Sequence, residues 1–177
     1  MYVEQFMSAP VDTVAPEQKL SQVSEMMREK GRRFLPVVDS DQRLVGLVSH
    51  RELERAEPSA ITTLDAGEVN YLLAKVTAEQ IMRRAVVTCA PQTLVEEAGR
   101  IMREQRVGCL PVVEAGRLLG IITDDDILDF FLSITGSTVA DSTRIAVHLR
   151  DRTGELSTLL RAINGFSQIL LDECRSQ

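Results

Sequence analysis

Hydrophobic residues recur at the spacing of a helix in some segments of the chain and form short strand-like runs in others. The order of these segments occurs twice. In the later occurrence, Leu94, Ala98, Ile101 and Met102 recur at helical spacing, which predicts a helix with one buried face. Two short apolar runs follow, CLPVV and LLGII, and the turn-like EAGR separates them. Such a pattern is typical of an antiparallel β-hairpin. Each occurrence is therefore predicted as strand, helix, strand, strand, helix.

The two occurrences are copies of one another. When they are aligned, Met7 falls on Met82 and the two LPVV runs coincide, at an offset of 75 residues. The offset shortens by one in the hairpin loop and then holds where Gly46 falls on Gly120. Two copies of one fold with hairpin loops of different length produce such a shift, so the chain is a tandem duplication.

Two helix starts in the second copy carry capping signals. Thr93 and Glu96 have the spacing of a capping box. Thr123 and Asp126 fall at the N-cap and first-turn positions of the helix that begins with DDDILDFFL. We interpret Asp124 and Asp125 as solvated first-turn acids that the helix dipole stabilises.

The LPVV run, the hairpin and a following G-h-h-[ST]-x-x-[DE]-[IL] motif, where h is apolar, occur twice in tandem. This arrangement resembles a pair of CBS domains, the Bateman module, and the resemblance covers residues 1 to about 134. It implies an α+β fold with pseudo-two-fold symmetry. The implied parts are a first CBS domain at 1–60, a connecting helix at 61–76 and a second CBS domain at 77–135. The connecting helix would carry one apolar stripe, formed by Val69, Leu72, Leu73 and Val76, that packs either within its own module or on a partner chain.

The tail at residues 143–177 resembles the opening strand, loop and helix of an ACT domain. The strand is expected at 144–150, the turn at 151–154, and the helix with Leu156, Leu159, Leu160 and Ile163 on one face. With the connector, this tail makes the chain similar to bacterial CBS proteins of the acetoin-utilisation type. Thr153 stands where the ACT loop usually has proline, and the sequence stops at Gln177, so we expect only a partial ACT-like segment. The alternative is a packing or dimerisation element.

The resemblance assigns the second copy a ribose site at Thr123 and Asp126. A carboxylate can accept two hydrogen bonds from the vicinal diol of a ribose, and the hydroxyl would lie beside the sugar and phosphate. The residues expected to wall the adenine are Val87, Thr88, Leu110 and Pro111. The alternative is that Thr123 and Asp126 only cap a helix.

The first copy departs from this pattern. Ser49 keeps the hydroxyl, but Glu52 replaces the aspartate and adds a rotor that binding must immobilise. We therefore expect a weaker or empty second site, formed by Thr13, Val14, Pro36, Ser49 and Glu52.

The first copy also contributes positive charge. We expect its Arg33, His50 and Arg51 to face the phosphate of a ligand whose ribose the second copy holds. The alternative for Arg32 and Arg33 is a solvated strand edge.

Composition and charge limit the classes of partner that are expected. The 177 residues carry a net charge of -6 and a pI near 5.0, with no concentrated basic face, so neither nucleic acid nor an anionic membrane is an expected partner. There is no apolar run of membrane-spanning length and no secretory signal pattern at the N-terminus, which favours a cytoplasmic location. Three cysteines and two histidines lack metal-ligand spacing, so no metal site is expected, and we interpret the cysteines as small buried hydrophobic residues.

These features favour a binding module over an enzyme. The sequence contains no G-x-S-x-G, Walker A or G-x-G-x-x-G motif, so we expect no catalysis and no required cofactor. The expected effector is an adenine nucleotide or adenosyl compound, namely AMP, ADP, ATP or S-adenosylmethionine. The expected protein partners are a second copy of the chain, through apolar helices such as ILDFFLSI, and an unidentified regulated protein. The alternative is a structural dimerisation protein without a small ligand.

Overall fold

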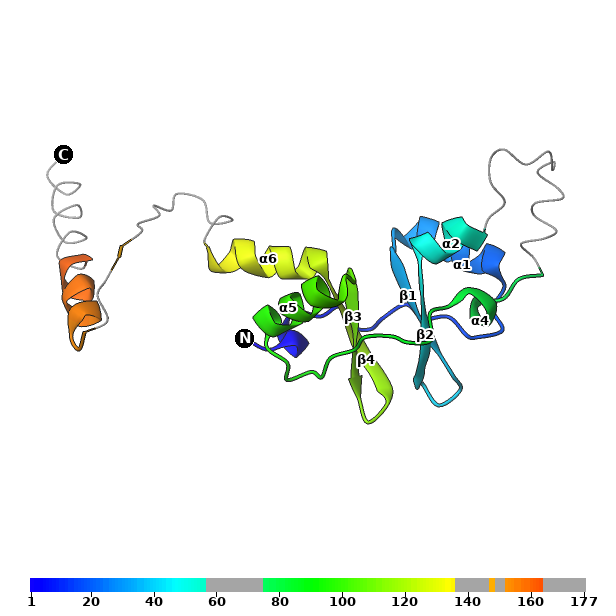
Figure 1. Cartoon of the computed structure of the whole chain (residues 1–177), viewed down its shortest axis with the longest axis horizontal. Helices are drawn as coiled ribbons and strands as arrows, with labels where there is room; N and C mark the ends of the chain where they lie inside the picture. The colour runs from blue at the N-terminus through cyan, green and yellow to red at the C-terminus, as the bar shows by residue number, and fades with distance from the viewer. Residues whose placement is uncertain (57–74, 136–146, 149–151, 164–177) are drawn as a thin grey trace, which may run out of the picture. The chain divides into compact units, whose positions relative to one another are not determined.

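The computed structural model describes residues 1–56, 75–135, 147–148 and 152–163. The chain divides into two units, residues 1–138 and 139–177. The first unit contains both copies of the repeat, and each copy forms a short helical turn, a helix, a hairpin and a second helix (Figure 1). In the first copy these are η1 (Val3–Gln5), α1 (Leu20–Lys30), β1 (Phe34–Val38), β2 (Leu44–Ser49) and α2 (His50–Ala56). In the second they are α4 (Ala78–Ile81), α5 (Val95–Gln105), β3 (Cys109–Glu114), β4 (Arg117–Thr123) and α6 (Asp124–Ile134).

The two hairpins are antiparallel and share an irregularity at the same place. The register shifts between Val37 and Val38 in the first hairpin, and between the equivalent valines of the second. The turn of the second hairpin consists of Ala115 and Gly116, both with positive φ (49° and 84°), as a two-residue hairpin turn requires. These observations confirm the predicted hairpins and the duplication.

The predicted first strand of each copy is reduced to a single bridge. Val14 and Cys89 each make one isolated parallel bridge to the neighbouring hairpin. Pro16 and Pro91 follow two residues later, and a proline has no N–H with which to continue a ladder. The prediction of a full strand at these positions was therefore wrong.

The start of α5 also differs from the prediction. The helix begins at Val95 with Leu94 as its N-cap. The Thr93 hydroxyl instead accepts a hydrogen bond from the Ala90 N–H at 3.1 Å, and the Thr93 N–H donates back to the Ala90 carbonyl at 3.0 Å. Thr93 thus closes the turn before the helix, and its predicted capping box with Glu96 was wrong.

The N-terminal segment of each copy packs into the other copy. The Val3 N–H donates to the Thr93 carbonyl (2.8 Å), and at the equivalent positions the Ala78 N–H donates to the Gln18 carbonyl (2.9 Å). Val3 belongs to the apolar core of the second copy, whereas Ala78 belongs to that of the first. The exchange is reciprocal, so each core needs residues from both copies.

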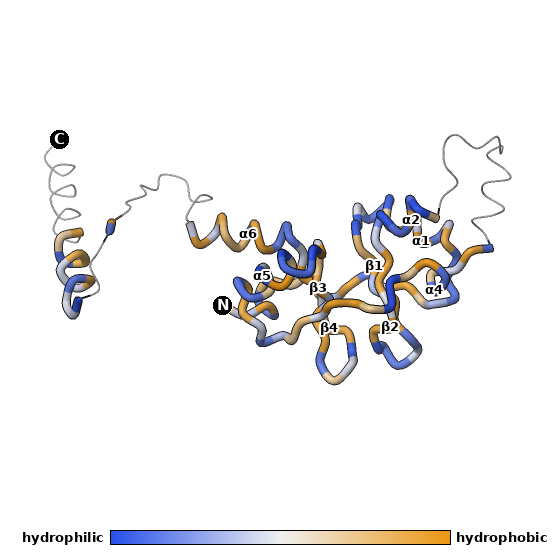
Figure 2. The backbone as a smooth tube through the Cα atoms, viewed as in Figure 1, coloured by the Kyte–Doolittle hydropathy of each residue, from blue (hydrophilic) through white to orange (hydrophobic). Residues whose placement is uncertain are grey.

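Two apolar cores result, one per copy, and Figure 2 shows their hydrophobic positions on the strands of both hairpins. The glycines of the repeated motif lie where the exchanged segments come closest. A Cβ at Gly120 would overlap Sδ of Met7, and a Cβ at Gly46 would overlap Sδ of Met82. Glycine is therefore required at these positions by close packing.

Most of the predicted connecting helix lies outside the described residues, as does most of its apolar stripe. At its described end, Lys75 forms a turn and Val76 is not helical, so the predicted helix does not extend to residue 76. Val76 packs against the first core.

In the second unit, the structure describes a helix over residues 155–163 that follows a turn at Thr153 and Gly154, as predicted. Leu156, Leu160 and Ile163 are exposed on this helix. The predicted strand at 144–150 lies outside the described residues except for Val147 and His148, which belong to no strand. Within the described ranges, no helix is both long enough and apolar enough to cross a membrane.

Candidate functional site

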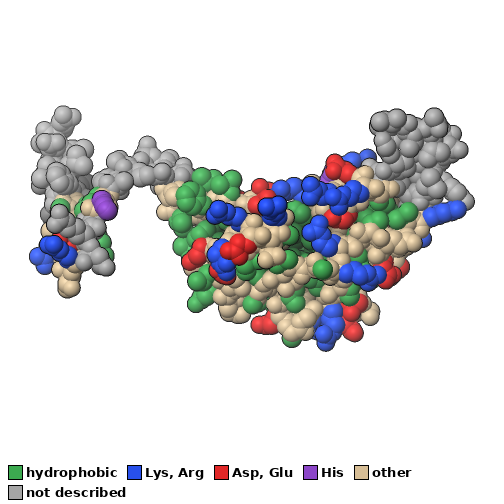
Figure 3. All heavy atoms as spheres, in the orientation of Figure 1, with side chains coloured by type: hydrophobic (Ala, Val, Ile, Leu, Met, Phe, Trp, Pro, Cys, Tyr) green, Lys and Arg blue, Asp and Glu red, His purple; other side chains and the backbone are tan. Residues whose placement is uncertain are grey.

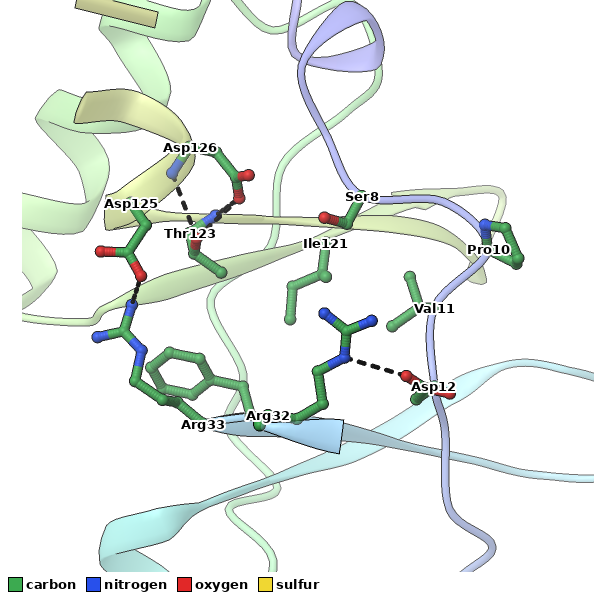
Figure 4. Close-up of a pocket in the computed structure, with 12 residues that line it drawn as sticks. Ser8, Pro10, Val11, Asp12, Arg32, Arg33, Ile121, Thr123, Asp125 and Asp126 are labelled. Carbon is green, nitrogen blue, oxygen red and sulfur yellow. Dashed lines mark hydrogen bonds and ion pairs between the residues drawn. The ribbon is translucent and has the colours of Figure 1, made fainter. Parts of the chain in front are cut away.

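A cavity of about 230 Å³ lies between the two copies, and we call it the Thr123 cavity (Figure 4). Its lining comes from both copies, namely Ser8, Pro10, Val11, Asp12, Gly31, Arg32, Arg33 and Phe34 of the first and Ile121, Thr123, Asp125 and Asp126 of the second. Reciprocal packing places the exchanged segment along one side, because Ser8 and Ile121 each donate a backbone hydrogen bond to the other.

Thr123 and Asp126 form one wall of this cavity as a capping box. The backbone N–H and the hydroxyl of Thr123 both donate to Oδ2 of Asp126, each at 2.7 Å. The Asp126 N–H donates back to the Thr123 hydroxyl at 3.4 Å. Thr123 is the N-cap of α6, so the predicted capping role is confirmed. Within the described part of the chain, Oδ1 of Asp126 makes no hydrogen bond, and it remains available to a ligand.

Two arginines of the first copy lie opposite this pair. Figure 4 shows the Arg32 guanidinium directed into the space beside Ile121 and Val11. Its Nε donates to Oδ2 of Asp12 at 3.1 Å. Hydrogen bonding from Lys30, more than from Arg32, lowers the pKa of Asp12 despite its partial burial. The sequence analysis did not include Arg32 among the site residues, because the sequence pattern does not show that this strand end faces the other copy.

Arg33 reaches across to the start of α6. Its Nη2 lies 2.5 Å from Oδ1 of Asp124 and 2.7 Å from Oδ2 of Asp125, and its guanidinium lies over the ring of Phe34, 5.4 Å from the centroid. The structure therefore brings Arg33 to the second copy, as expected. Asp124 and Asp125 are solvated first-turn acids, as predicted, with side chains 52% and 75% exposed, and both are in addition ion-paired to Arg33. The hydrogen bond to Asp124 raises the pKa of Arg33, so the guanidinium stays charged.

The four residues predicted to wall the adenine do not line this cavity. Leu110 is fully buried in the second core, Pro111 is buried, and Val87 packs against the same core. The wall beside Thr123 is formed instead by Pro10 and Val11 of the first copy. That Val87, Thr88, Leu110 and Pro111 wall an adenine stays a prediction.

A second cavity, of about 180 Å³, occupies the pseudo-symmetric position, and we call it the Ser49 cavity. Its lining comprises Phe34, Leu47, Ser49, Arg51, Glu52, Arg83, Arg106, Val107, Gly108 and Cys109. Phe34 thus borders both cavities.

Both oxygens of Glu52 are engaged in the Ser49 cavity. The Ser49 N–H donates to Oε2 at 3.1 Å, the Ser49 hydroxyl donates to the same oxygen, and Nη2 of Arg83 lies 3.2 Å from Oε1. Burial alone would raise the pKa of Glu52, but hydrogen bonds from Ser49 and Arg83 outweigh it and lower the pKa.

The other predicted residues of the weaker site are not gathered with Ser49 and Glu52. Thr13 and Val14 line a separate cavity near Val38, and Pro36 is fully buried. The backbone of Val14 pairs with Val37 of β1, and the role of Thr13, Val14 and Pro36 in a weaker site stays a prediction.

The predicted phosphate-binding set is also divided. Arg33 lines the Thr123 cavity, whereas Arg51 lines the Ser49 cavity. His50 lines neither, and its Nδ1 lies 3.3 Å from Oε1 of Glu54. The division arises because His50 and Arg51 begin α2, while Arg33 reaches toward α6.

The structure confirms the interpretation of two cysteines as buried hydrophobic residues. Burial raises the pKa of the Cys89 thiol to about 11, and burial with the nearby charge of Asp124 raises that of Cys109 to about 12. Cys174 lies outside the described residues. In the ranges that the structure describes, no three His, Cys, Asp or Glu side chains gather to hold a metal ion.

Comparison with known proteins gives matches across the duplicated region. An uncharacterized protein of Methanocaldococcus jannaschii is 32% identical over 132 residues, which cover 73% of this chain and 46% of that protein. A Vibrio cholerae structure assigned to acetoin utilization (AcuB) is similar with a TM-score of 0.66 and 27% identity, covering 81% of this chain and 98% of that one. The Arabidopsis thaliana protein CBSX2, solved in complex with AMP, has a TM-score of 0.63 and 28% identity, covering 75% of this chain and 97% of that one.

The chain spans less than half of the length of the first curated relatives that it matches. The family model of the CBS domain matches residues 3–59 and 78–133, and it does not extend into the tail at residues 143–177. These two matches cover more than half of the chain and coincide with the two copies of the repeat. The chain therefore belongs to the CBS domain family, as a tandem CBS pair.

Proposed function

We propose that this chain is a regulatory sensor module that binds an adenine nucleotide or another adenosyl compound in the Thr123 cavity and signals to a partner protein. One observation carries the proposal. Asp126 presents an oxygen without a hydrogen bond among the described residues to a cavity that both copies form, and the Thr123 capping box fixes its carboxylate. Preorganisation of this kind lowers the cost of binding.

A ribose fits the chemistry of this carboxylate. Oδ1 can accept from one hydroxyl of a vicinal diol, and Oδ2 retains acceptor capacity beside its bonds from Thr123. The complex of the related CBSX2 with AMP supports an adenosyl ligand. The rest of the chemistry favours binding over catalysis, since the Thr123 hydroxyl and the Asp126 carboxylate are joined to each other as a helix cap and the lining includes no histidine, lysine or cysteine.

The phosphate of a nucleotide would meet Arg33 and Arg32 on the opposite wall. Both arginines are ion-paired, and a phosphate on Arg33 would compete with its carboxylate partners Asp124 and Asp125. Asp124 and Asp125 lie in the first turn of α6, and their release would alter the start of that helix. Ligand binding would thereby act on α6, which gives the module a route to its partners.

A second copy of the chain is the partner that the surface of α6 favours. Ile127 and Phe130 pack against the core, but Leu128, Phe131 and Ile134 remain 52–56% exposed on another face. Figure 3 shows hydrophobic side chains at the surface over α6. We propose a cytoplasmic homodimer that uses this face. The same face supports the alternative function, a structural dimerisation protein without a ligand.

Calorimetry and thermal unfolding with AMP, ADP, ATP and S-adenosylmethionine test the proposal. At least one compound should raise the melting temperature, because a ligand that binds the native state stabilises it by mass action. Asp126→Asn should weaken binding about tenfold or more, since a hydrogen bond to a charged group is lost. Glu52→Gln is the matched control and should leave that affinity nearly unchanged. If no compound binds, the ligand-free alternative holds instead.

A further inference from the structure

The two cavities of the CBS pair occupy equivalent positions but carry opposite charge. Three acids and two arginines line the Thr123 cavity, whereas three arginines and one glutamate line the Ser49 cavity. We propose that the Ser49 cavity is an oxyanion site of the phosphate class and does not accept a nucleoside.

Arg83 closes the Ser49 cavity to ribose. The repeat aligns Arg83 with Ser8, whose short side chain leaves Oδ1 of Asp126 open in the other cavity. In the Ser49 cavity, Arg83 is ion-paired to Oε1 of Glu52 and Ser49 occupies Oε2. The Glu52 side chain is only 12% exposed. A diol would have to displace an arginine from a mostly buried carboxylate, which is unfavourable because the cation would lose its partner.

Two further arginines supply charge that Glu52 does not neutralise. Among the described residues, Arg51 and Arg106 make no side-chain ion pair or hydrogen bond, although both line the cavity. Arginine offers a planar fork of donors that matches the oxygens of a phosphate. The apolar wall formed by Phe34, Val107 and Cys109 lowers the local dielectric and strengthens such contacts.

The backbone at Arg106 gives separate support. Arg106 ends α5 with φ of 54°, in the left-handed region, and the repeat aligns it with Gly31, which ends α1 with φ of 60°. This conformation favours glycine, as the first copy shows. This backbone conformation disfavours arginine, so the presence of Arg106 needs another reason. A role of its side chain in binding an anion supplies that reason.

Two kinds of ligand would bring a phosphate-class oxyanion to the Ser49 cavity. It is either a free anion such as pyrophosphate or the phosphate tail of a nucleotide whose ribose lies in the Thr123 cavity, since Phe34 borders both cavities. The second source rests on the proposed function, whereas the first does not.

Calorimetry on the full chain with pyrophosphate, adenosine, AMP and ATP tests the proposal, with Arg106→Gly as the decisive variant. This change copies Gly31 and suits the backbone, so the fold should be retained. We expect Arg106→Gly to weaken pyrophosphate binding about tenfold or more, or, for the nucleotide source, to weaken ATP binding while sparing AMP, whose single phosphate would lie at Arg33 in the Thr123 cavity. Raised salt should weaken the same contacts. If Arg106→Gly changes neither pyrophosphate binding nor the difference between ATP and AMP, the oxyanion site is wrong.

Two controls separate this proposal from the function of the Thr123 cavity. Asp126→Asn should weaken the binding of adenosine but leave the binding of pyrophosphate unchanged. A failure of the chain to bind adenosine therefore refutes only the proposed function. The wild type should bind one adenosine per chain. The double variant Arg83→Ser with Glu52→Asp, which copies the open cavity, should bind two. Two adenosines on the wild type would show that the Ser49 cavity accepts nucleosides and would overturn the proposal.

Discussion

Arg33 of the first copy lies 2.5 Å from Asp124 of the second, measured from Nη2 to Oδ1, and so joins the two repeats beside the Thr123 cavity. The two side chains are 49% and 52% exposed, so water screens the pair and its stabilisation is no more than about 1 kcal/mol. The contact therefore matters more for the charge that it places at the cavity than for the stability of the fold.

Arg33→Ala is expected to weaken the binding of AMP about tenfold and to leave the binding of adenosine nearly unchanged, because only AMP carries a phosphate. Calorimetry with both ligands measures the difference. Raising the salt concentration should reproduce part of the effect on the wild type, since these contacts reach solvent. An equal loss for both ligands would show that Arg33 supports the cavity rather than the phosphate.

Gly120→Ala is expected to lower the free energy of unfolding by about 1–3 kcal/mol, because the new methyl group would overlap Met7 of the exchanged segment. Urea unfolding measures the change. The second substitution Met7→Ala removes the obstacle, so the double variant should lose less stability than the sum of the single variants. Additive losses would mean that Met7 does not limit the space at Gly120.

Acid stability should depend on Glu52. Its pKa in the folded protein lies below the ordinary value of 4.5, so the ionised form contributes stability above that value. This contribution is lost as pH falls through the lower folded pKa. Urea unfolding of the wild type and Glu52→Gln at neutral pH and near pH 3.5 should show a larger acid loss for the wild type. Parallel losses would contradict the role of Ser49 and Arg83 in lowering the pKa.

Phe131→Glu is expected to shift the chain from dimer to monomer without unfolding it. The side chain is 56% exposed, so the substitution leaves the core intact but places a charge on the apolar face of α6. Light scattering across micromolar concentrations reports the mass, and circular dichroism reports the fold. A wild type that is already monomeric throughout this range would refute the proposed homodimer.

Cys89 and Cys109 should resist thiol reagents in the native state at pH 8. Their pKa values of about 11 and about 12 leave almost no thiolate, and both side chains are buried. In a Cys174→Ser background, both thiols should react only after urea unfolding. Rapid labelling of either thiol in the folded protein would show that its core opens locally.

Local patterns in the sequence determined much of the secondary structure of this protein. The duplication, both hairpins and the capping pair Thr123 and Asp126 followed from the sequence, because period, turn residues and three-residue spacing act over short distances along the chain. The same short range explains why the CBS family was recognisable from its repeated motif. The prediction at Thr93 failed at this level, since a turn with Ala90 competed for the same hydroxyl.

Only the tertiary structure decided which copy faces which cavity. The exchange of Val3 and Ala78 between cores brings Val11 of the first copy into the wall of the Thr123 cavity. It also sets Arg83 against Glu52, and the approach of the copies sets Arg33 against Asp124. These partners are 31 and 91 residues apart in the chain. No local preference specifies such pairs, because they form only when two packed cores fix the distance and direction between side chains.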